Sequence, residues 1–263
     1  MIDSNPGGEY KPLGGSTPAE ALKEYRRMGN HFKRYVFARN YCKGKNVLDY
    51  GCGYGVGYLI LKDHLKSYTG IDLDTEAIHW ATTYLKSPKS KFYTVNDYLS
   101  CSASVSFDIA ISFEFIEHVS DPLAYLRFLK TSIKDGGTII ISTPNGLWSN
   151  GDKDLFRTNY HLFEYSPQEI NEFLKPLFKN IVFYKEKRID NLDFLGFKIQ
   201  HMDNRTNKYS DGRVSSTKTM AHSIVDFAYR HLNGPSFWKI QKTEFEAMNA
   251  LDYSTIVVTA RNS

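Results

Sequence analysis

The sequence predicts an α/β protein built around a doubly wound sheet. Residues 46–50 form a short apolar run, glycines recur through residues 51–57, and residues 58–65 continue as a helical segment. This strand, glycine turn and helix make the first unit of a βαβ fold. Short apolar strands and helical segments then alternate, and acidic residues stand at or near the ends of the first three strands. Together these observations indicate a nucleotide-type cofactor above the turn, where a helix N-terminus presents unpaired N–H groups.

The spacing of the glycines distinguishes between cofactors. A dinucleotide site uses Gly-x-Gly-x-x-Gly, but the sixth position is Val56 in one frame and Tyr58 in the other. An acid instead precedes the first glycine by two residues. The resulting Asp-x-Gly-x-Gly pattern resembles motif I of the class I S-adenosylmethionine-dependent methyltransferases, in which glycine backbone cradles the methionine portion. The residues that this resemblance places at the cofactor are Asp49, Gly51, Cys52 and Gly53.

Composition favours one α/β domain with an appended or inserted segment. A chain of 263 residues with 41% apolar and 14% aromatic residues can bury a core without disulfides. Cys42, Cys52 and Cys101 show no C-x-x-C spacing, which argues against a disulfide framework or a zinc knuckle. With no apolar signal core and no run of membrane-spanning length, we expect a soluble, cytoplasmic protein without an integral membrane segment. The net charge of +4 is spread along the chain and gives little support for nucleic acid as a partner.

The first 40 residues are expected to comprise a flexible segment and a lid helix. Residues 1–18 are rich in glycine, proline and serine, which favours loop. Thr17 and Pro18 then resemble an N-cap followed by proline at the first helical position. The basic helix that follows suits either a solvated face or a lid. As a lid, it would bring Arg34 or Tyr35 to the carboxylate of the cofactor, because arginine pairs with carboxylates in bidentate fashion.

The second strand, residues 67–72, ends in Asp72. This acid follows the first glycine by about 20 residues, where a carboxylate can accept hydrogen bonds from both ribose hydroxyls. Leu73 would then pack on the adenine face. The alternative for Asp72 is an N-cap of the next helix, and Asp74 competes for that position.

The third strand, residues 91–95, runs into Asn96, Asp97 and Tyr98. Taken alone, Asn-Asp is an ordinary turn signal. The methyltransferase resemblance implies more, because the acid after the third strand in such enzymes accepts a hydrogen bond from the adenine amino group. Asp97 matches that position, and its two neighbours are expected to line the same part of the cofactor site.

The fourth strand, residues 107–113, leads into the most specific part of the resemblance. Several short runs are similar, in order and spacing, to methyltransferases associated with glycan, O-antigen and other polysaccharide assembly. They are Arg34-Tyr35-Val36-Phe37-Ala38, Ser112-Phe113-Glu114-Phe115-Ile116-Glu117-His118, Ser142-Thr143-Pro144-Asn145 and Asn159-Tyr160-His161. The match spans residues 25–187 and departs from the pattern at Tyr54, where close relatives often carry an acid. It implies S-adenosylmethionine as cofactor and a sugar, nucleotide-sugar or glycan hydroxyl as acceptor.

Methyl transfer to a hydroxyl requires alignment of the acceptor with the sulfonium and removal of a proton. A neutral histidine suits that proton, so His161 and His118 are the candidate bases; positioning without a base is the alternative. Glu117 either orients His118 or holds the acceptor. The carbonyl near Phe113 is expected to receive the cofactor's ammonium. Glu114 is placed at the cofactor or at an acceptor hydroxyl.

No required metal is expected from the sequence. Magnesium sites need several carboxylate or amide oxygens in one cluster. Glu114, Glu117 and Asn145 could supply such oxygens, but their spacing along the chain has no diagnostic pattern. The prediction is therefore a transferase that works without a metal ion.

The resemblance completes the fold as a Rossmann-like sheet of seven strands, mostly parallel, with an antiparallel last strand beside the fifth. The later strands are predicted at residues 138–142, 180–187 and 254–261. The predicted organisation is a flexible segment and lid, a cofactor-binding core, a substrate-side insertion and a last core strand, at residues 1–40, 41–189, 190–253 and 254–263.

The insertion at residues 190–253 is longer than the usual connection in compact domains. Basic residues alternate there with aromatic ones, among them Arg213, Arg230 and Trp238. This mixture suits a sugar or sugar-phosphate surface. A helical cap or a dimer contact explains it equally well. We expect the insertion to decide the acceptor, with the protein a monomer or homodimer.

Other function classes fit the motifs less well. A nucleic-acid methyltransferase acting on exocyclic amines is expected to carry Asn/Asp-Pro-Pro-aromatic after the fourth strand, where Glu114-Phe115-Ile116 stands. A cytosine-C5 enzyme needs a Pro-Cys motif, and the glycine spacing disfavours a nicotinamide-dependent enzyme. A quinone- or polyketide-type small-molecule O- or N-methyltransferase and a non-catalytic cofactor-binding module stay open, because their cofactor half would look the same.

Overall fold

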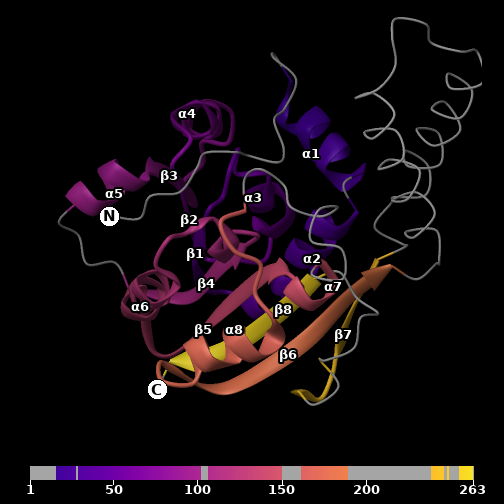
Figure 1. Ribbon diagram of the computed structural model, residues 1–263. Helices are drawn as coiled ribbons and strands as arrows, with labels where there is room; N and C mark the ends of the chain where they lie inside the picture. Colours follow the sequence, from indigo (N-terminus) through magenta and orange to yellow (C-terminus); the bar gives the residue numbers. More distant parts are fainter. Residues whose placement is uncertain are drawn as a thin grey trace, which may run out of the picture.

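The computed structural model describes residues 16–27, 29–101, 106–149, 161–188, 238–245, 248 and 255–262. This part of the chain confirms the α/β fold with a single sheet, in the order β3-β2-β1-β4-β5-β8-β6-β7 (Figure 1). The strands are β1 (Asn46–Tyr50), β2 (Ser67–Asp72), β3 (Ser90–Thr94), β4 (Phe107–Phe113), β5 (Ile133–Pro144), β6 (Phe178–Arg188), β7 (Trp238–Lys242) and β8 (Thr255–Asn262).

The first five strands are parallel, and β8 pairs antiparallel with β5, as predicted for the last strand. The sheet has eight strands where seven were predicted. The additional strand, β7, lies inside the predicted insertion and pairs antiparallel with β6 along the edge of the sheet. Its five residues carry two lysines and a glutamine, so the sequence gives little strand signal. The rest of residues 190–253, apart from 243–245 and 248, lies outside the described residues.

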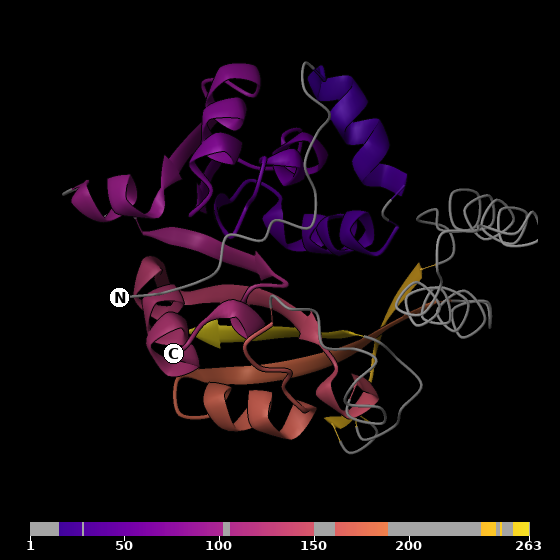
Figure 2. The same ribbon diagram turned by 45° about the horizontal axis from the view of Figure 1, so that its top comes forward.

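Helices cover both faces of the sheet (Figure 2). They are α1 (Pro18–Arg27), α2 (Asn30–Cys42), α3 (Val56–Leu61), α4 (Thr75–Tyr84), α5 (Val95–Ser100), the 3₁₀ turn η1 (Ile116–His118), α6 (Pro122–Ser132), α7 (Gly146–Ser149) and α8 (Pro167–Leu174). Alternate residues of a strand point to opposite faces. In β5, Ile139 and Ile141 join the core beneath α6 and α8, whereas Ile140 joins the core beneath α2, α3 and α4.

The N-terminal helix begins where the sequence predicts. The Thr17 hydroxyl accepts from the backbone N–H of Glu20, and the Glu20 carboxylate accepts from the Thr17 backbone N–H. One helix was expected through Tyr35, but the chain forms two, because Gly29 has φ 45° and separates α1 from α2. Only Ala21 of α1 is buried, whereas α2 buries four side chains, including Arg34. α2 is therefore part of the core, and a lid stays a prediction for α1.

The topology fixes where a site can form. The carboxyl ends of β1 to β5 meet at one edge of the sheet because these strands are parallel. The chain leaves β1 toward β2 on one side, and β4 lies on the other, so the sheet reverses its order between β1 and β4. Open α/β sheets bind ligands at this switch point. No helix within the described ranges is long and apolar enough to cross a membrane.

Candidate active site at the carboxyl ends of the strands

In the glycine turn after β1, a side chain would clash with its surroundings at one glycine and would meet open space at another. Gly51 has φ +79°, and a Cβ there would lie 2.4 Å from the ring of Phe115. Gly53 has φ +51°, but a Cβ there would meet no atom within 4 Å. The first glycine is therefore required by packing, whereas the second leaves backbone open to a ligand. Cys52 lies between them with its side chain in the core, and burial raises the pKa of its thiol.

Asp72 fastens the glycine turn to the end of β2. Its Oδ2 accepts from the N–H of Gly53 at 2.7 Å, and its Oδ1 accepts from the N–H of Asp74 at 2.9 Å. Burial raises the pKa of Asp72. Asp74, rather than Asp72, caps α4 by accepting from two backbone N–H groups. Asp72 therefore does not cap α4, and its carboxylate is hydrogen-bonded to the glycine turn instead. The ribose role of Asp72 stays a prediction.

Asp49 is a fully buried acid beneath the turn. Its Oδ2 accepts from the hydroxyls of Tyr35 at 2.9 Å and Tyr68 at 2.5 Å. Its Oδ1 has no hydrogen-bond partner among the described residues. Burial raises the pKa of Asp49 to about 7, against the two tyrosine hydrogen bonds, which lower it. Tyr35, expected at the cofactor carboxylate, therefore acts on the site through Asp49.

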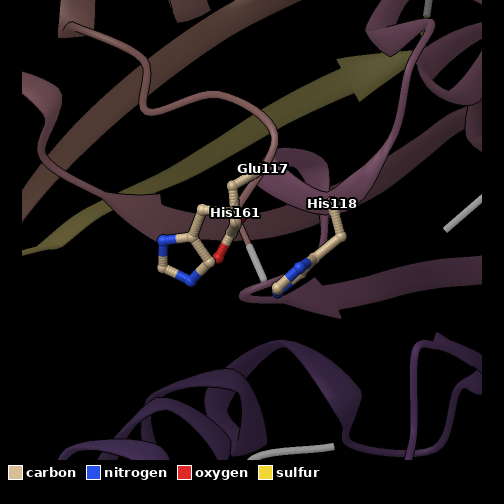
Figure 3. A group of neighbouring side chains, drawn as sticks. All are labelled: Glu117, His118 and His161. Atoms are coloured by element: carbon tan, nitrogen blue, oxygen red, sulfur yellow. The ribbon is translucent and has the colours of Figure 1, made fainter. Parts of the chain in front are cut away.

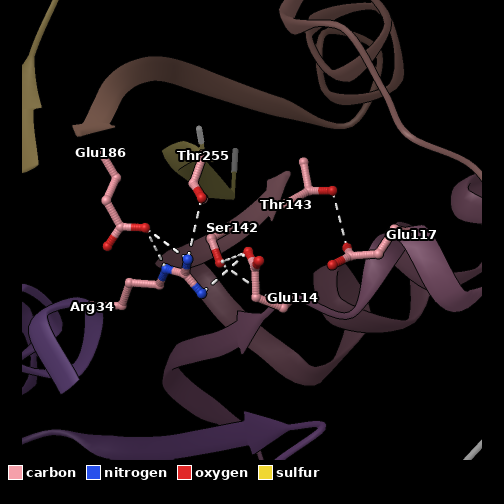
Figure 4. Close-up of polar contacts among 7 residues, drawn as sticks. All are labelled: Arg34, Glu114, Glu117, Ser142, Thr143, Glu186 and Thr255. Carbon is pink, nitrogen blue, oxygen red and sulfur yellow. Dashed lines mark hydrogen bonds and ion pairs between the residues drawn. The ribbon is translucent and has the colours of Figure 1, made fainter. Parts of the chain in front are cut away.

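Arg34 is buried among polar partners from three other parts of the chain. Its Nε and Nη2 donate to Oε2 of Glu186 at 2.9 and 2.7 Å, and Nη2 also donates to Thr255 (Figure 4). Its Nη1 lies 3.3 Å from Oε1 of Glu114. The expected contact of Arg34 with the cofactor carboxylate stays a prediction, and the guanidinium already has acidic partners within the chain. The sequence could not show that acids on β6 and after β4 lie beside the guanidinium of Arg34.

The chain turns sharply after β4 at Glu114. Its φ of 50° is unusual for a residue with a side chain, and such strain is often held at functional sites. Here it is held by Ser142, whose carbonyl and hydroxyl oxygens accept from the Glu114 N–H and whose hydroxyl donates to Glu114 Oε1 at 2.8 Å. Phe113 packs edge-on against Tyr35 with ring centroids 5.1 Å apart. The predicted pair at the end of β4 is thus rigidly placed.

The predicted adenine contacts lie at the start of α5. Asp97 Oδ2 accepts from the hydroxyl of Thr94 at 2.6 Å, and Thr94 caps the helix. Asn96 and Asp97 are exposed. Leu73 and Tyr98 are partly buried and pack against the core. Asp97 therefore has a structural task as well, and its adenine role stays a prediction.

Glu117, His118 and His161 come together at the same edge of the sheet (Figure 3). One ligand-capable atom from each lies within 4.8 Å of the others. Glu117 is wholly buried and His118 is 8% exposed. Both belong to η1, whereas His161 comes from the segment before α8. The two imidazole rings pack edge to face with centroids 5.0 Å apart. These are the three predicted catalytic residues, and the fold makes them neighbours.

Other polar residues around this cluster were missed by the sequence analysis. Thr143 donates to Glu117 Oε2 at 3.0 Å, and Glu164 Oε1 lies 3.1 Å from Nδ1 of His161. The N–H groups of Leu162 and Phe163 donate to the carbonyl oxygen of Glu117 at 2.9 and 3.2 Å. Thr143 lies within the Ser-Thr-Pro-Asn run that carried the resemblance, but Glu164 had no signal beyond standing three residues after His161. Asn159 and Tyr160 lie outside the described residues.

Comparison with known proteins assigns the family. A family model described as a methyltransferase domain matches residues 23–181. A probable S-adenosylmethionine-dependent methyltransferase of Mycolicibacterium smegmatis is 26% identical over 168 residues, which are 62% of this chain and 63% of that protein. A ubiquinone biosynthesis O-methyltransferase of Xanthomonas campestris pv. campestris is 37% identical over 114 residues, 42% of this chain and 48% of that protein.

The solved structures agree on the fold. The structure of a possible histamine N-methyltransferase from Thermotoga maritima has a TM-score of 0.56 and 12% identity and covers 93% of this chain and 95% of its own. The chain spans about half to two thirds of the length of the curated relatives it matches. Since the family model covers more than half of the sequence, the chain belongs to the methyltransferase domain family.

Proposed function

We propose that this chain is an S-adenosylmethionine-dependent O-methyltransferase. The observation that carries the proposal is the glycine turn at the switch point of the sheet, where Gly53 has an open face and is tied to Asp72. Backbone at Gly51 and Gly53 can lie against the methionine portion of the cofactor while Asp72 accepts from the ribose hydroxyls. Membership in the methyltransferase domain family supports the same cofactor.

Asp49 complements the positive end of that cofactor. Its buried Oδ1 lacks a hydrogen-bond partner among the described residues, and buried polar atoms are nearly always satisfied. A ligand ammonium, directly or through a water molecule, supplies the missing donor. A nearby positive charge also favours the ionised form of a carboxyl group whose pKa is raised to about 7. The residues present therefore fit S-adenosylmethionine on both charge and hydrogen bonding.

The other half of the site handles the acceptor. S-adenosylmethionine supplies a methyl group on a positively charged sulfur, which leaves as a neutral thioether when an acceptor oxygen takes the methyl carbon. The chain must align that oxygen and remove its proton. We place His161, His118 and Glu117 at the acceptor hydroxyl, because they gather at the carboxyl edge of the strands beyond β4.

Two acceptor classes are proposed. The first is a hydroxyl of a sugar, nucleotide-sugar or glycan, which the resemblance in sequence favours. The second is a hydroxyl of a quinone-type small molecule, which the name of the Xanthomonas relative and its 37% identity favour equally. Residues 190–253 are proposed to shape the acceptor side and to decide between the two.

Calorimetry tests the cofactor. The purified chain is titrated in parallel with S-adenosylmethionine, S-adenosylhomocysteine and NAD. We expect micromolar binding of the two sulfur ligands and none of NAD. Binding of NAD alone would overturn the proposal, and the glycine turn would then have to be assigned to a dehydrogenase.

Radiolabelled methyl transfer tests the acceptor. The chain is incubated with labelled cofactor and, separately, nucleotide-sugars, glycan fragments and hydroxylated quinone precursors. Label transferred to one class identifies it. Tight cofactor binding without label transfer to any of them would favour the non-catalytic module.

A further inference from the structure

We infer that Glu117, His118 and His161 form a binding site for a divalent first-row transition-metal ion. The inference deepens the proposed function, on which its catalytic role rests, although the metal site itself can be measured without it. It departs from the sequence prediction of no required metal. The sequence separates the Glu117–His118 pair from His161 by more than 40 residues, and only the fold brings the three ligands together.

The geometry suits a single ion. The ligand atoms lie within 4.8 Å of one another, and ligands about 2.1 Å from an ion stand roughly 3 to 4 Å apart. The observed spacing is therefore close to that of an occupied site and somewhat wider. Figure 3 shows the side chains of Glu117, His118 and His161 gathered at one place. Backbone hydrogen bonds from Leu162 and Phe163 to the Glu117 carbonyl hold the segment carrying His161 against η1, so the two sources of ligands are fixed to each other.

The groups around the ligands are those that metal sites use. A metal-binding histidine usually donates its second ring N–H to a carboxylate, which orients the ring. Nδ1 of His161 lies 3.1 Å from Oε1 of Glu164. Because a carboxylate only accepts, Nδ1 carries the proton and Nε2 is left with the lone pair that binds metal. Thr143 in turn donates to Oε2 of Glu117 and orients that carboxylate. A histidine that only packs in the core needs no carboxylate to orient its ring.

The donor set selects the ion. Carboxylate and water oxygens alone suit Mg²⁺ and Ca²⁺, whereas imidazole suits iron, zinc, copper and nickel. Two imidazoles with one carboxylate make a mixed set for ions such as Mn²⁺, Fe²⁺, Co²⁺ and Zn²⁺. Three protein ligands also leave coordination positions open, as catalytic metal sites do. The site thus has room for oxygen atoms of an acceptor.

Such an ion changes the task of the two histidines. As ligands they no longer remove the acceptor's proton themselves. The ion binds the acceptor hydroxyl and lowers its pKa, so the proton is lost to water before the oxygen takes the methyl group. With open positions on one ion, the acceptor class is a hydroxyl with a second oxygen on the neighbouring carbon. Vicinal sugar hydroxyls and ortho-oxygenated phenols both have this form.

Manganese binding tests the site directly. The tag-free chain, treated with chelator and desalted, is titrated with Mn²⁺ without cofactor or acceptor, and free Mn²⁺ is measured by its electron paramagnetic resonance signal. We expect one ion per chain. His161→Ala should weaken the binding at least ten-fold, and Glu164→Ala about ten-fold or more, as is usual when the group orienting a ligand is removed. His79→Ala, an exposed histidine on α4, is the matched control and should leave binding unchanged.

Two results would overturn the inference. One is absence of stoichiometric binding of Mn²⁺, Co²⁺ and Zn²⁺ to the folded chain. The other is binding that His161→Ala and His118→Gln leave unchanged, with circular dichroism showing that both variants are folded. Cofactor calorimetry on the same samples separates this result from the proposed function, because a chain that binds Mn²⁺ through His161 but not S-adenosylmethionine keeps the metal site and loses the methyltransferase proposal.

Removal of the metal then tests its role in transfer. Once an acceptor is known, chelator treatment should abolish methyl transfer, and Mn²⁺ should restore it, while cofactor affinity stays constant. Full activity in metal-depleted chain would return His161 and His118 to their predicted roles as bases.

Discussion

The cofactor side and the acceptor side of this site are built in different ways. On the cofactor side, Gly53 bonds to Asp72 and Asp49 bonds to Tyr68, each across 19 positions of sequence. On the acceptor side, Thr143 bonds to Glu117 across 26 positions, and the N–H of Leu162 bonds to the Glu117 carbonyl from 45 positions away. The first region is made by one βαβ unit, whereas the second is assembled from η1, the end of β5 and the segment before α8.

The two regions also differ in how their charges are held. The acids of the cofactor side, Asp49 and Asp72, accept from neutral hydroxyl and backbone N–H groups. On the acceptor side, the Glu164 carboxylate lies 3.1 Å from Nδ1 of His161. Beyond the end of β4, the guanidinium of Arg34 lies between Glu114 and the buried carboxylate of Glu186. Substitutions on the first side should therefore change cofactor affinity, and those at the buried ion pair should change stability.

The largest effect is expected from Arg34→Ala. Glu186 is fully buried, burial raises its pKa, and the Arg34 guanidinium opposes that rise. Removing one member of a buried pair leaves an uncompensated group, which costs about 3–5 kcal/mol of unfolding free energy. Denaturant unfolding followed by circular dichroism measures it.

A surface pair provides the control for that prediction. Lys134 lies 2.9 Å from Asp108, almost as close as the Arg34–Glu186 contact of 2.7 Å, but the lysine side chain is 48% exposed. Lys134→Ala should cost no more than about 1 kcal/mol, because exposed pairs are screened by water. If Arg34→Ala and Lys134→Ala lost the same unfolding free energy, burial would not explain the strength of the Arg34–Glu186 pair.

This contrast explains what the sequence could predict. The glycine turn, Asp72 and the capping of α1 and α8 depend on neighbouring residues, and each has a local pattern. No local pattern predicts the partner of Arg34, because Glu186 lies 152 positions away in the sequence. The extra edge strand β7 was missed for a related reason, because pairing with β6 stabilises a run that is weakly strand-forming by itself.

The acceptor-side cluster lies between these cases. Its three members were predicted from motifs after β4 and β5, but the contact of His161 with the other two was not. Whether two histidines form a base and a neighbour or two ligands depends on distances below 5 Å, which spacing along a chain does not encode. The role of Glu164 could not be predicted for the same reason, because it depends on the contact of its carboxylate with His161.

The second prediction concerns turnover. His161→Ala should lower the rate of methyl transfer about 100-fold or more, because the acceptor loses either its base or a ligand of the ion that lowers its pKa. It should leave S-adenosylmethionine affinity intact. Rates with a known acceptor and calorimetry with the cofactor measure the two quantities. A rate equal to that of the unaltered chain would remove His161 from the acceptor side.

The third prediction moves to the cofactor side. Asp72→Ala should weaken cofactor binding by about 1–3 kcal/mol through lost hydrogen bonds to the ribose. Asp74→Ala is the control, because Asp74 caps α4 through its side chain and should cost about 1 kcal/mol of stability with cofactor affinity unchanged. Calorimetry and thermal unfolding separate the effects. Unchanged affinity in the Asp72 variant would disprove the ribose contact.

The fourth prediction is a pH dependence from Asp49. Its pKa is about 7 in the folded chain and about 3.9 when unfolded. Because the folded state holds this proton more tightly, the contribution of Asp49 to stability is greatest below pH 4. It falls by about 1.4 kcal/mol per pH unit as the pH rises to 7, and is constant above. The difference in unfolding free energy between the unaltered chain and Asp49→Asn, measured from pH 4 to 8, should follow this course. If the unfolding free energies of the two proteins changed in parallel with pH, the raised pKa of Asp49 would be contradicted.

The smallest effect compares two glycines with the same backbone requirement. Gly53 and Gly44 have φ of +51° and +69°, and a Cβ at either position would meet no atom within 4 Å. Alanine at each should cost about 1–2 kcal/mol of stability, because only the left-handed conformation is penalised.

The two variants should differ in function, since Gly53 lies in the turn tied to Asp72 and Gly44 lies between α2 and β1. Gly53→Ala adds a methyl group to the open face on which the cofactor is proposed to rest, so it should lower S-adenosylmethionine affinity, whereas Gly44→Ala should not. If calorimetry gave both variants the same affinity, the open face of the turn would not be where the cofactor binds. The division between a local cofactor side and an assembled acceptor side would then have to be redrawn around Asp49.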